Sequence, residues 1–316
     1  MTIWLSNSSK SPHVRLTGRR LQEAVRNAAD LGIVIPAFNV PYLPMLEPIA
    51  RTLAEHRVLG MIQVARLEIT KFESKSLSAV ADEYHKYADP TLTSLHLDHT
   101  PVIDEDGLIC NWESLIQEAI SLGYDSVMID GSRLPLRENI AVTRRVVEMA
   151  HPKGVLVEAE LGAVLGHEAA PLPPYDELFE NKKGFTDPQE AKIFVLETGV
   201  DWLSVSVGTI HGPISQAMRG QAKVAAKIDI EHLRTIREAT NIPLVLHGGS
   251  GVQQSYLNEA IRNGIAKINI ATDIRQPYEG VLSQGGDIRA AQAAVASVVR
   301  HLVCDTYNIQ GSADRL

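Results

Sequence analysis

Short runs of hydrophobic, largely β-branched residues recur along the chain at nearly even spacing. They predict eight β-strands, at residues 33–39, 58–65, 92–97, 126–130, 155–160, 202–207, 243–246 and 266–270. The mean step between successive runs is about 33 residues, the size of a strand with its following helix. The runs are nearly continuous rather than alternating, which is typical of parallel strands covered on both faces.

Amphipathic patterns between these runs predict helices over 113–122, from an N-cap at Asp187, over 229–239, and over 252–263. Strand and helix alternate throughout, which favours an α/β fold, a single (β/α)8 TIM barrel with long loops after the fifth and sixth strands. A doubly wound open sheet is the alternative, but no G-x-G-x-x-G follows the first strand. We assign residues 1–316 to one domain, with an N-terminal extension over about 1–16 and a C-terminal helical segment over about 286–310.

The composition is typical of a soluble globular protein, with 45% hydrophobic and 22% charged residues. The net charge of −8 argues against general binding to a nucleic-acid backbone. Two cysteines, Cys110 and Cys304, exclude a disulfide scaffold and a multi-cysteine zinc module. The sequence shows no signal peptide and no run of 18 apolar residues, so we expect a cytoplasmic protein without a membrane partner.

Three histidines stand at or just after predicted strand ends: His99, His211 and His247. Because the carboxyl ends of barrel strands meet at one rim, these imidazoles are predicted to converge. Three imidazoles with an open fourth position are typical of a catalytic zinc site. A single histidine at such a position is more often a packing residue, but three at matching ends favour a metal. His96 is the weaker candidate, since strict alternation sends residues 96 and 99 to opposite faces.

Glycine-rich or polar turns follow the last two strands, at Gly248-Gly249-Ser250 and at Asn269–Thr272. This is the recurrent phosphate position of such barrels. Glycines let backbone N–H groups approach an anion, and a following helix N-terminus adds a favourable dipole. A tight turn that needs glycine only for positive φ is the alternative interpretation.

At these residues the sequence resembles the class II, zinc-dependent ketose-bisphosphate aldolases, the group of fructose- and tagatose-bisphosphate aldolases. Matching motifs run in order from Ala37–Val40 to Asn269–Thr272 and cover most of the chain. The most specific are LHLDH at 95–99, SVMIDGS at 126–132, VEAELG at 157–162, VGTIHG at 207–212 and LVLHGGSG at 244–251. The resemblance implies reversible cleavage of a ketose 1-phosphate or 1,6-bisphosphate to dihydroxyacetone phosphate and an aldehyde, by a homodimer or homotetramer.

The resemblance also implies residue roles. His99, His211 and His247 correspond to the Zn²⁺ ligands, and Glu160 to a second metal position. Asp98 corresponds to the acid/base for the C4 hydroxyl, or else orients a zinc-bound histidine. Glu168 corresponds to the residue that moves the C3 proton, or else is a solvated loop carboxylate. The substrate and its C1 phosphate would be held by Asn39, Gly212, Gly248, Gly249, Ser250, Asn269, Ala271 and Thr272. Carbonyls near Gly212 and Gly248 would hold a Na⁺ or K⁺ ion.

The sequence departs from the family after the second strand. The family usually has a Gln-x-Ser motif there, whereas Ala65 and Arg66 follow Gln63-Val64 here. The stretches 65–76 and 100–107 are also unusual, and they would form the end of the pocket that takes the aldehyde half. Arg66 and Lys71 either bind a different terminal anion there, such as a sulfonate or phosphate, or are surface charges on a variable loop.

Three other functions stay open at this point. The same chemistry could act on a sulfonated or deoxy ketose phosphate. A metal-dependent sugar-phosphate isomerase or epimerase would need two acid/base groups flanking one carbon, but not the pairing of His-Gly with His-Gly-Gly-Ser. A non-catalytic phosphosugar-binding subunit would need no trio of zinc-binding histidines.

Overall fold

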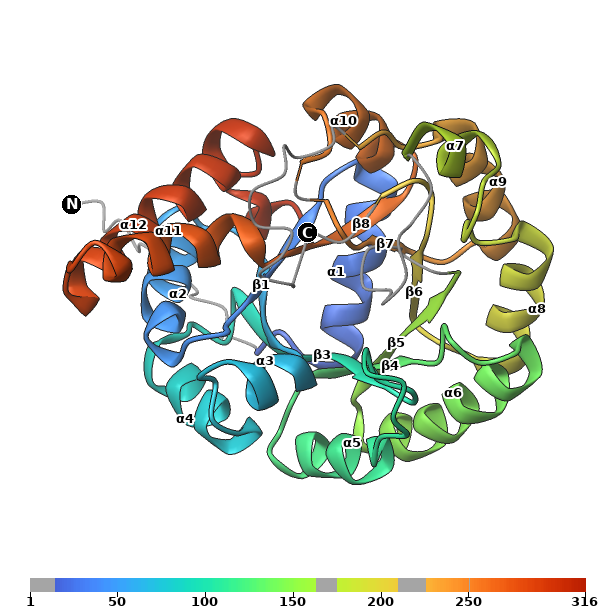
Figure 1. The fold of residues 1–316 in the computed structure, drawn as a ribbon, viewed down its shortest axis with the longest axis horizontal. Helices are drawn as coiled ribbons and strands as arrows, with labels where there is room; N and C mark the ends of the chain where they lie inside the picture. Colours follow the sequence, from blue (N-terminus) through green and yellow to red (C-terminus); the bar gives the residue numbers. More distant parts are fainter. Residues whose placement is uncertain (1–14, 163–174, 210–225, 250) are drawn as a thin grey trace, which may run out of the picture.

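A computed structural model describes residues 15–162, 175–209, 226–249 and 251–316. Its eight strands are all parallel and close into a barrel in sequence order (Figure 1). They are β1 Ile35–Asn39, β2 Gly60–Val64, β3 Thr93–Pro101, β4 Ser126–Asp130, β5 Leu156–Leu161, β6 Trp202–Val205, β7 Leu244–Leu246 and β8 Ile265–Ile270. Each strand coincides with one of the eight predicted hydrophobic runs. The predicted (β/α)8 TIM barrel is therefore confirmed.

Helices surround the strands in Figure 1. The α-helices are α1 Gly18–Leu31, α2 Leu46–Glu55, α3 Arg66–Lys71, α4 Leu77–Tyr87, α5 Trp112–Ser121, α6 Leu136–Ala150, α7 Tyr175–Glu180, α8 Pro188–Thr198, α9 Ile230–Thr240, α10 Gln254–Arg262, α11 Thr272–Ser283 and α12 Ile288–His301. Short helical turns occupy Leu43–Met45, His151–Lys153, Leu302–Thr306 and Ser312–Asp314. The predicted N-cap of α8 is confirmed, because the Asp187 carboxylate accepts hydrogen bonds from Gln189 N and Glu190 N at 2.8 and 2.9 Å.

Helix α1 lies across the amino-terminal end of the barrel, at the centre of the view in Figure 1. Its buried side chains, including Leu21 and Val25, pack with inward-facing residues from the starts of the strands, such as Ile35, Met61 and Trp202. Burial of this apolar layer stabilises the barrel and fills its lower half. The carboxyl-terminal end is therefore the end at which polar groups can gather.

Above this apolar layer, the barrel interior becomes polar. Gln63, His96, Glu158 and Lys267 come from four different strands, and none of them is exposed to solvent. Buried polar groups are stable only when they are paired, so these residues must form a connected network. That network lies directly beneath the strand ends that carry the candidate chemistry.

An irregularity in β3 changes which residues face inward. Strict alternation predicts that His96 and His99 face opposite ways, and this prediction is wrong. The register with β4 shifts between Leu97 and Thr100, so the strand carries a bulge there. As a result His96 and His99 both point towards glutamates of the neighbouring interior, at Glu158 and Glu160 respectively.

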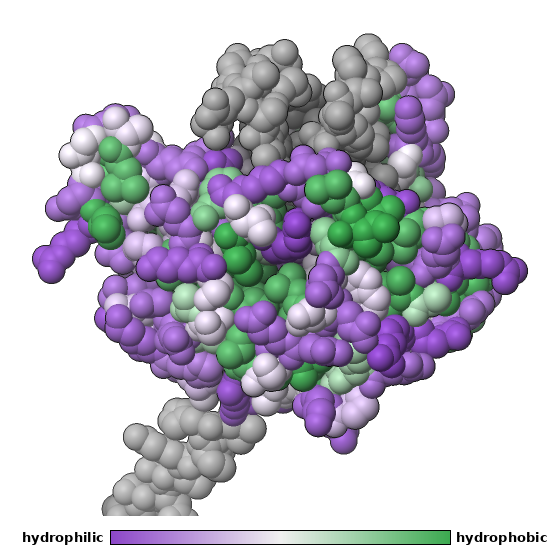
Figure 2. Space-filling view, turned by 60° about the horizontal axis from the view of Figure 1, so that its bottom comes forward, coloured by the Kyte–Doolittle hydropathy of each residue, from purple (hydrophilic) through white to green (hydrophobic). Residues whose placement is uncertain are grey.

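The outer surface is mostly hydrophilic on the face shown in Figure 2, with hydrophobic residues in scattered groups. Among the described residues, the most exposed large apolar side chains are Ile109 and Leu196, which lie on different elements. No helix in the described part of the chain is long and apolar enough to span a bilayer.

Gly162, directly after β5, is expected to tolerate no side chain. Its φ is +89°, and a Cβ atom would lie 2.6 Å from Thr186 Oγ1. Gly162→Ala should therefore lower the free energy of unfolding by about 3 kcal/mol, because left-handed strain and overpacking add. Gly154→Ala is the matched control, since its φ is +72° but nothing lies within 4 Å. It should lose only about 1 kcal/mol in urea denaturation. If both variants lost the same free energy of unfolding, the close contact with Thr186 would be relieved at no cost, and the prediction would be wrong.

Candidate active site

Two histidines and two carboxylates meet at the carboxyl end of the barrel. The rings of His99, on β3, and His247, directly after β7, have centroids 4.5 Å apart. His99 Nδ1 lies 3.2 Å from Asp130 Oδ2 and 3.9 Å from Glu160 Oε2. His247 Nδ1 lies 3.4 Å from the same Glu160 oxygen. The structure thus brings His99, His247 and Glu160 together, as the strand-end pattern predicts.

Four other predicted site residues lie outside the described residues. They are His211, Gly212, Glu168 and Ser250.

The residues present fit a divalent cation. His247 Nε2 is hydrogen-bonded to Glu158 Oε1 at 3.0 Å, whereas the buried Nδ1 lies 3.4 Å from Glu160 Oε2 and forms no hydrogen bond among the described residues. A buried ring nitrogen without a partner is unfavourable unless a ligand satisfies it. Ligand atoms of Asp98, His99 and His247 all lie within 4.8 Å of one another, and so do those of His99, Asp130 and Glu160. Imidazole nitrogens and carboxylate oxygens are the donors that zinc takes in catalytic sites.

The electrostatics of this cluster favour a positive charge within it. Burial alone would lower the pKa of the His99 imidazole, but the nearby carboxylates of Asp98, Asp130 and Glu160 outweigh burial and raise that pKa to about 10. Burial alone would raise the pKa of Asp130, but its hydrogen bond with His99 lowers it to about 2. Asp130 is therefore ionised at neutral pH and ready to hold a cation.

Asp98 is held by an amide group on each side. Asn39 Nδ2 donates to Asp98 Oδ2 at 2.9 Å, and Asn269 Nδ2 donates to Oδ1 at 2.9 Å. Each amide is itself oriented, because Asn39 Oδ1 accepts from Gln63 and Asn269 Oδ1 accepts from Lys267, both at 2.7 Å. Burial would raise the pKa of Asp98, but the positive charges of His99 and Lys267 hold it well below its ordinary value. Asp98 is thus an ionised carboxylate in a fixed orientation.

A buried ion pair supports both the histidine and the aspartate. Lys267 Nζ lies 2.9 Å from Glu158 Oε2, and neither side chain is exposed. Trp202 Nε1 donates to the same Glu158 oxygen at 2.7 Å. Burial would raise the pKa of Glu158, but the charge of Lys267 outweighs it and holds that pKa well below its ordinary value. Glu158 thus stays ionised and orients His247 from below.

His96 completes this network as a neutral group. Burial and the charge of Lys267 lower the pKa of His96 to about 3. Its Nδ1 lies 2.8 Å from Ser126 Oγ. Residue 96 is therefore part of the packed polar layer and not of the cluster at the rim.

Three residues of this candidate site were given no role from the sequence. Asp130 ends a predicted strand, so the same strand-end rule would have found it. Lys267 is a lone charge in the hydrophobic run 266–270, and a buried charge in a strand signals a buried partner. Glu158 stands two residues before Glu160, but its partner Lys267 is far away in sequence, and no local signal reveals the pairing.

The residues that the sequence predicts to bind a phosphate follow two neighbouring strands, β7 and β8. Gly248 follows β7 with a φ of +68°, and helix α11 begins at Thr272 with Ala271 as its N-cap. Because Leu246 and Ile268 are paired in the register of β7 and β8, the two turns are adjacent. The first N–H groups of α11 lack partners within the helix and are suited to an anion.

Arg66 and Lys71, which the sequence analysis considered for the end of the pocket that takes the aldehyde, are both paired with carboxylates. Arg66 Nη2 lies 3.3 Å from Asp104 Oδ2. Lys71 Nζ lies 2.5 Å from Glu105 Oε1 and 3.0 Å from Asp106 Oδ2. The acidic stretch 104–106 therefore neutralises the positive charges of helix α3.

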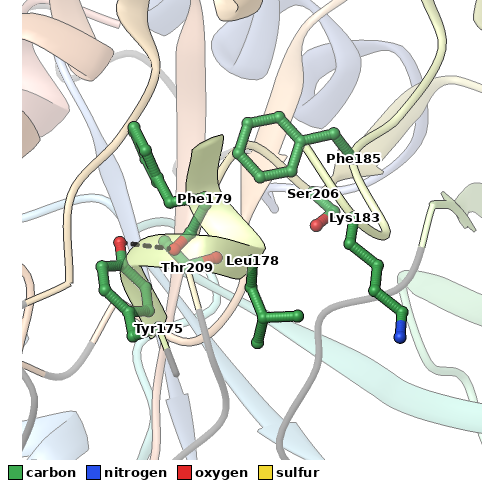
Figure 3. Close-up of a pocket in the computed structure, with 8 residues that line it drawn as sticks. Tyr175, Leu178, Phe179, Lys183, Phe185, Ser206 and Thr209 are labelled. Carbon is green, nitrogen blue, oxygen red and sulfur yellow. Dashed lines mark hydrogen bonds between the residues drawn. The ribbon is translucent and has the colours of Figure 1, made fainter. Parts of the chain in front are cut away.

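A small pocket lies between helix α7 and the end of β6 (Figure 3). It is lined by Tyr175, Leu178, Phe179, Lys183, Phe185, Ser206, Gly208 and Thr209. The Tyr175 hydroxyl lies 3.0 Å from Gly208 O and accepts a hydrogen bond from Lys227 N at 2.6 Å. Tyr175 thus links Gly208 and Lys227, which lie before and after the predicted ligand His211 in the sequence.

A TIM barrel with imidazoles and carboxylates at its carboxyl-terminal rim is typical of metal-dependent enzymes. The model of the family "Fructose-bisphosphate aldolase class-II" matches residues 19–315, so the chain belongs to this family. The expected resemblance is confirmed, and the protein is an aldolase, a lyase that acts on carbon–carbon bonds.

Solved structures support the same assignment. The chain is similar to the YdjI aldolase from Escherichia coli K12, with 26% identity, a TM-score of 0.72, and coverage of 93% of this chain and 98% of that one. A putative fructose-1,6-biphosphate aldolase from Coccidioides immitis is 26% identical, with a TM-score of 0.74 and coverage of 95% and 99%. The fructose-bisphosphate aldolase from Campylobacter jejuni, at 19% identity and a TM-score of 0.72 over 93% and 96%, shares the fold.

Removing the charge of Lys267 should strongly destabilise the barrel. Lys267→Met leaves Glu158 ionised and buried, so we expect a loss of about 3–5 kcal/mol in urea denaturation. The double variant Lys267→Met/Glu158→Gln should recover much of this loss, because both charges are then gone. Lys227→Met is the surface control, since its partner Asp176 is exposed and 3.5 Å away. A double variant no more stable than Lys267→Met would contradict the charge argument.

Proposed function

We propose that this aldolase is metal-dependent and cleaves a ketose 1-phosphate into dihydroxyacetone phosphate and an aldehyde. The observation that carries the proposal is the convergence of Asp98, His99 and His247 within 4.8 Å at the barrel rim. Two neighbouring imidazoles beside a fixed carboxylate combine a metal position with an acid/base.

His99 and His247 would hold the metal, with His211 as the third imidazole that the family resemblance implies. When bound, a zinc ion supplies a Lewis acid for the C2 carbonyl and for the negative charge that develops on its oxygen. Asp130 and Glu160 would form a second metal position together with His99, because their ligand atoms lie within 4.8 Å of one another. Lys267 is not a free amine nucleophile, because Glu158 and Asn269 hold its ammonium group in the interior. This supports a metal route rather than a Schiff base.

Asp98 would take the proton of the C4 hydroxyl during cleavage. As the C3–C4 bond breaks, C4 becomes an aldehyde carbon, and its oxygen must lose that proton. Asn39 and Asn269 fix the Asp98 carboxylate from both sides, which favours transfer along one direction. In the aldol direction the same group returns the proton to the new hydroxyl.

The remaining assignments rest on the family resemblance. The C1 phosphate would lie against Gly248, Gly249, Ser250 and the turn 269–272, close to Gly212. Glu168 would move the proton at C3. A Na⁺ or K⁺ ion would be held by carbonyls near Gly212 and Gly248, and two or four chains would assemble.

Metal removal tests the proposal directly. Treatment with EDTA should abolish release of dihydroxyacetone phosphate in a coupled assay, and added Zn²⁺ should restore it. An isomerase or epimerase would release no dihydroxyacetone phosphate, and a binding subunit would show no turnover. Release that survives complete removal of metal would overturn the metal-dependent mechanism.

Two variants separate the metal ligands from the acid/base. Asp98→Asn should keep bound zinc but lower kcat by about 10²–10⁴, because proton transfer is lost. His247→Ala should lose zinc as well as activity, as measured by metal analysis of the purified protein. His85→Ala, at an exposed position on α4, is the control and should change neither value. If His247→Ala retained full zinc, the ligand assignment would be wrong.

A further inference from the structure

A buried carboxyl group at the barrel mouth has no role in the reaction described so far. Glu68, on helix α3, is 6% exposed. Its Oε2 atom accepts hydrogen bonds from Ala65 N at 2.8 Å and from Asn39 Nδ2 at 3.2 Å. The same Asn39 nitrogen donates to Asp98 Oδ2 at 2.9 Å. One amide group therefore bridges Glu68 and the carboxylate proposed to serve the C4 hydroxyl.

The other oxygen of Glu68 is the part of the group left available. Oε1 makes no hydrogen bond within the described part of the chain, and 6% of the surface of Glu68 is exposed. Burial raises the pKa of Glu68 to about 8, so the carboxyl group carries a proton at neutral pH. A protonated carboxyl group can both donate to and accept from a hydroxyl group.

The charges around Glu68 do not favour a phosphate. Arg66, the nearest cation along the helix, is paired with Asp104, and Lys71 is paired with Glu105 and Asp106. A terminal phosphate would have to separate these pairs and approach the ionised Asp98. A hydroxyl group meets no such repulsion, since it needs only one donor and one acceptor.

We propose that Glu68 selects the aldehyde half of the substrate by hydrogen-bonding a hydroxyl group beyond C5. The substrates would then be ketose 1-phosphates whose far end carries hydroxyl groups and no phosphate. This inference rests on the proposed aldolase function and adds the chemical class of the aldehyde. In the aldol direction, C3 of dihydroxyacetone phosphate loses one proton and bonds to the aldehyde carbon, whose oxygen gains a proton.

The test measures aldol addition to saturating dihydroxyacetone phosphate with the metal-loaded enzyme. The aldehydes are both enantiomers of glyceraldehyde, threose, glyceraldehyde 3-phosphate, and glycolaldehyde, which has no hydroxyl group beyond its C2. For the wild type we expect kcat/KM at least about tenfold higher for glyceraldehyde or threose than for glyceraldehyde 3-phosphate.

Glu68 variants then test the residue itself. Glu68→Met keeps the length of the side chain but cannot form the hydrogen bond, so kcat/KM for glyceraldehyde and threose should fall about tenfold, mainly through KM. Glycolaldehyde should change less than about twofold, because it cannot reach the group. Glu68→Gln should recover most of the loss, since its amide still donates and accepts. Asp106→Asn, which removes an exposed carboxylate from the same rim, is the matched control.

Several results would overturn the inference. A wild-type preference for glyceraldehyde 3-phosphate would do so, and so would equal losses of Glu68→Met on every aldehyde, which would make Glu68 a positioning residue for Asp98. No loss at all would also overturn it. Exchange of the C3 proton of dihydroxyacetone phosphate in D₂O, without any aldehyde, tests the proposed function separately. If the C3 proton exchanges but the aldehyde preferences differ from those expected, only this inference is wrong. If the proton does not exchange, the proposed function itself is wrong.

Discussion

Glu158 and Lys267 form an ion pair in the middle of the barrel, where neither side chain reaches solvent. Transfer of two charges into such an interior is costly, and their attraction alone rarely compensates for it. Here the pair is satisfied by further partners, because Trp202 and His247 bond to Glu158 and Asn269 accepts from Lys267. The ring of His247 and the amide of Asn269 take their orientations from this pair. The rim cluster therefore depends on it.

The barrel separates stabilising and functional layers along its axis. Helix α1 and the starts of the strands form an apolar plug, which supplies hydrophobic burial without polar groups to satisfy. The polar layer lies above it and orients the groups at the strand ends. The bulge in β3 adds a second effect, since Asp98 and His99 are neighbours in sequence and yet both face the interior cluster. A regular strand would place one of them on the outside.

Much of the fold was predictable from local pattern. The eight hydrophobic runs coincide with the eight strands, and the predicted N-cap at Asp187 starts helix α8. The helix predicted over 229–239 is present as α9, for which Asp229 is the N-cap. The convergence of His99 and His247 followed from a general rule, because all parallel strands of a barrel end at the same rim. The shared inward position of His96 and His99 did not follow, since a bulge depends on how two strands pair and leaves no periodic signal.

Pairing between distant residues decided the rest. The sequence by itself determined the order of the elements, the barrel and the types of ligand at its rim, because these depend on periodicity and on strand ends. The tertiary structure alone decided which charged side chains are available to bind a ligand. Arg66 and Lys71 look like anion-binding residues in the sequence, yet carboxylates of 104–106 neutralise both. Glu68 looks like an ordinary helix residue, yet Asn39 places it beside Asp98. Hydrogen bonds and ion pairs act over a few ångströms in space, and separation along the chain does not reveal them.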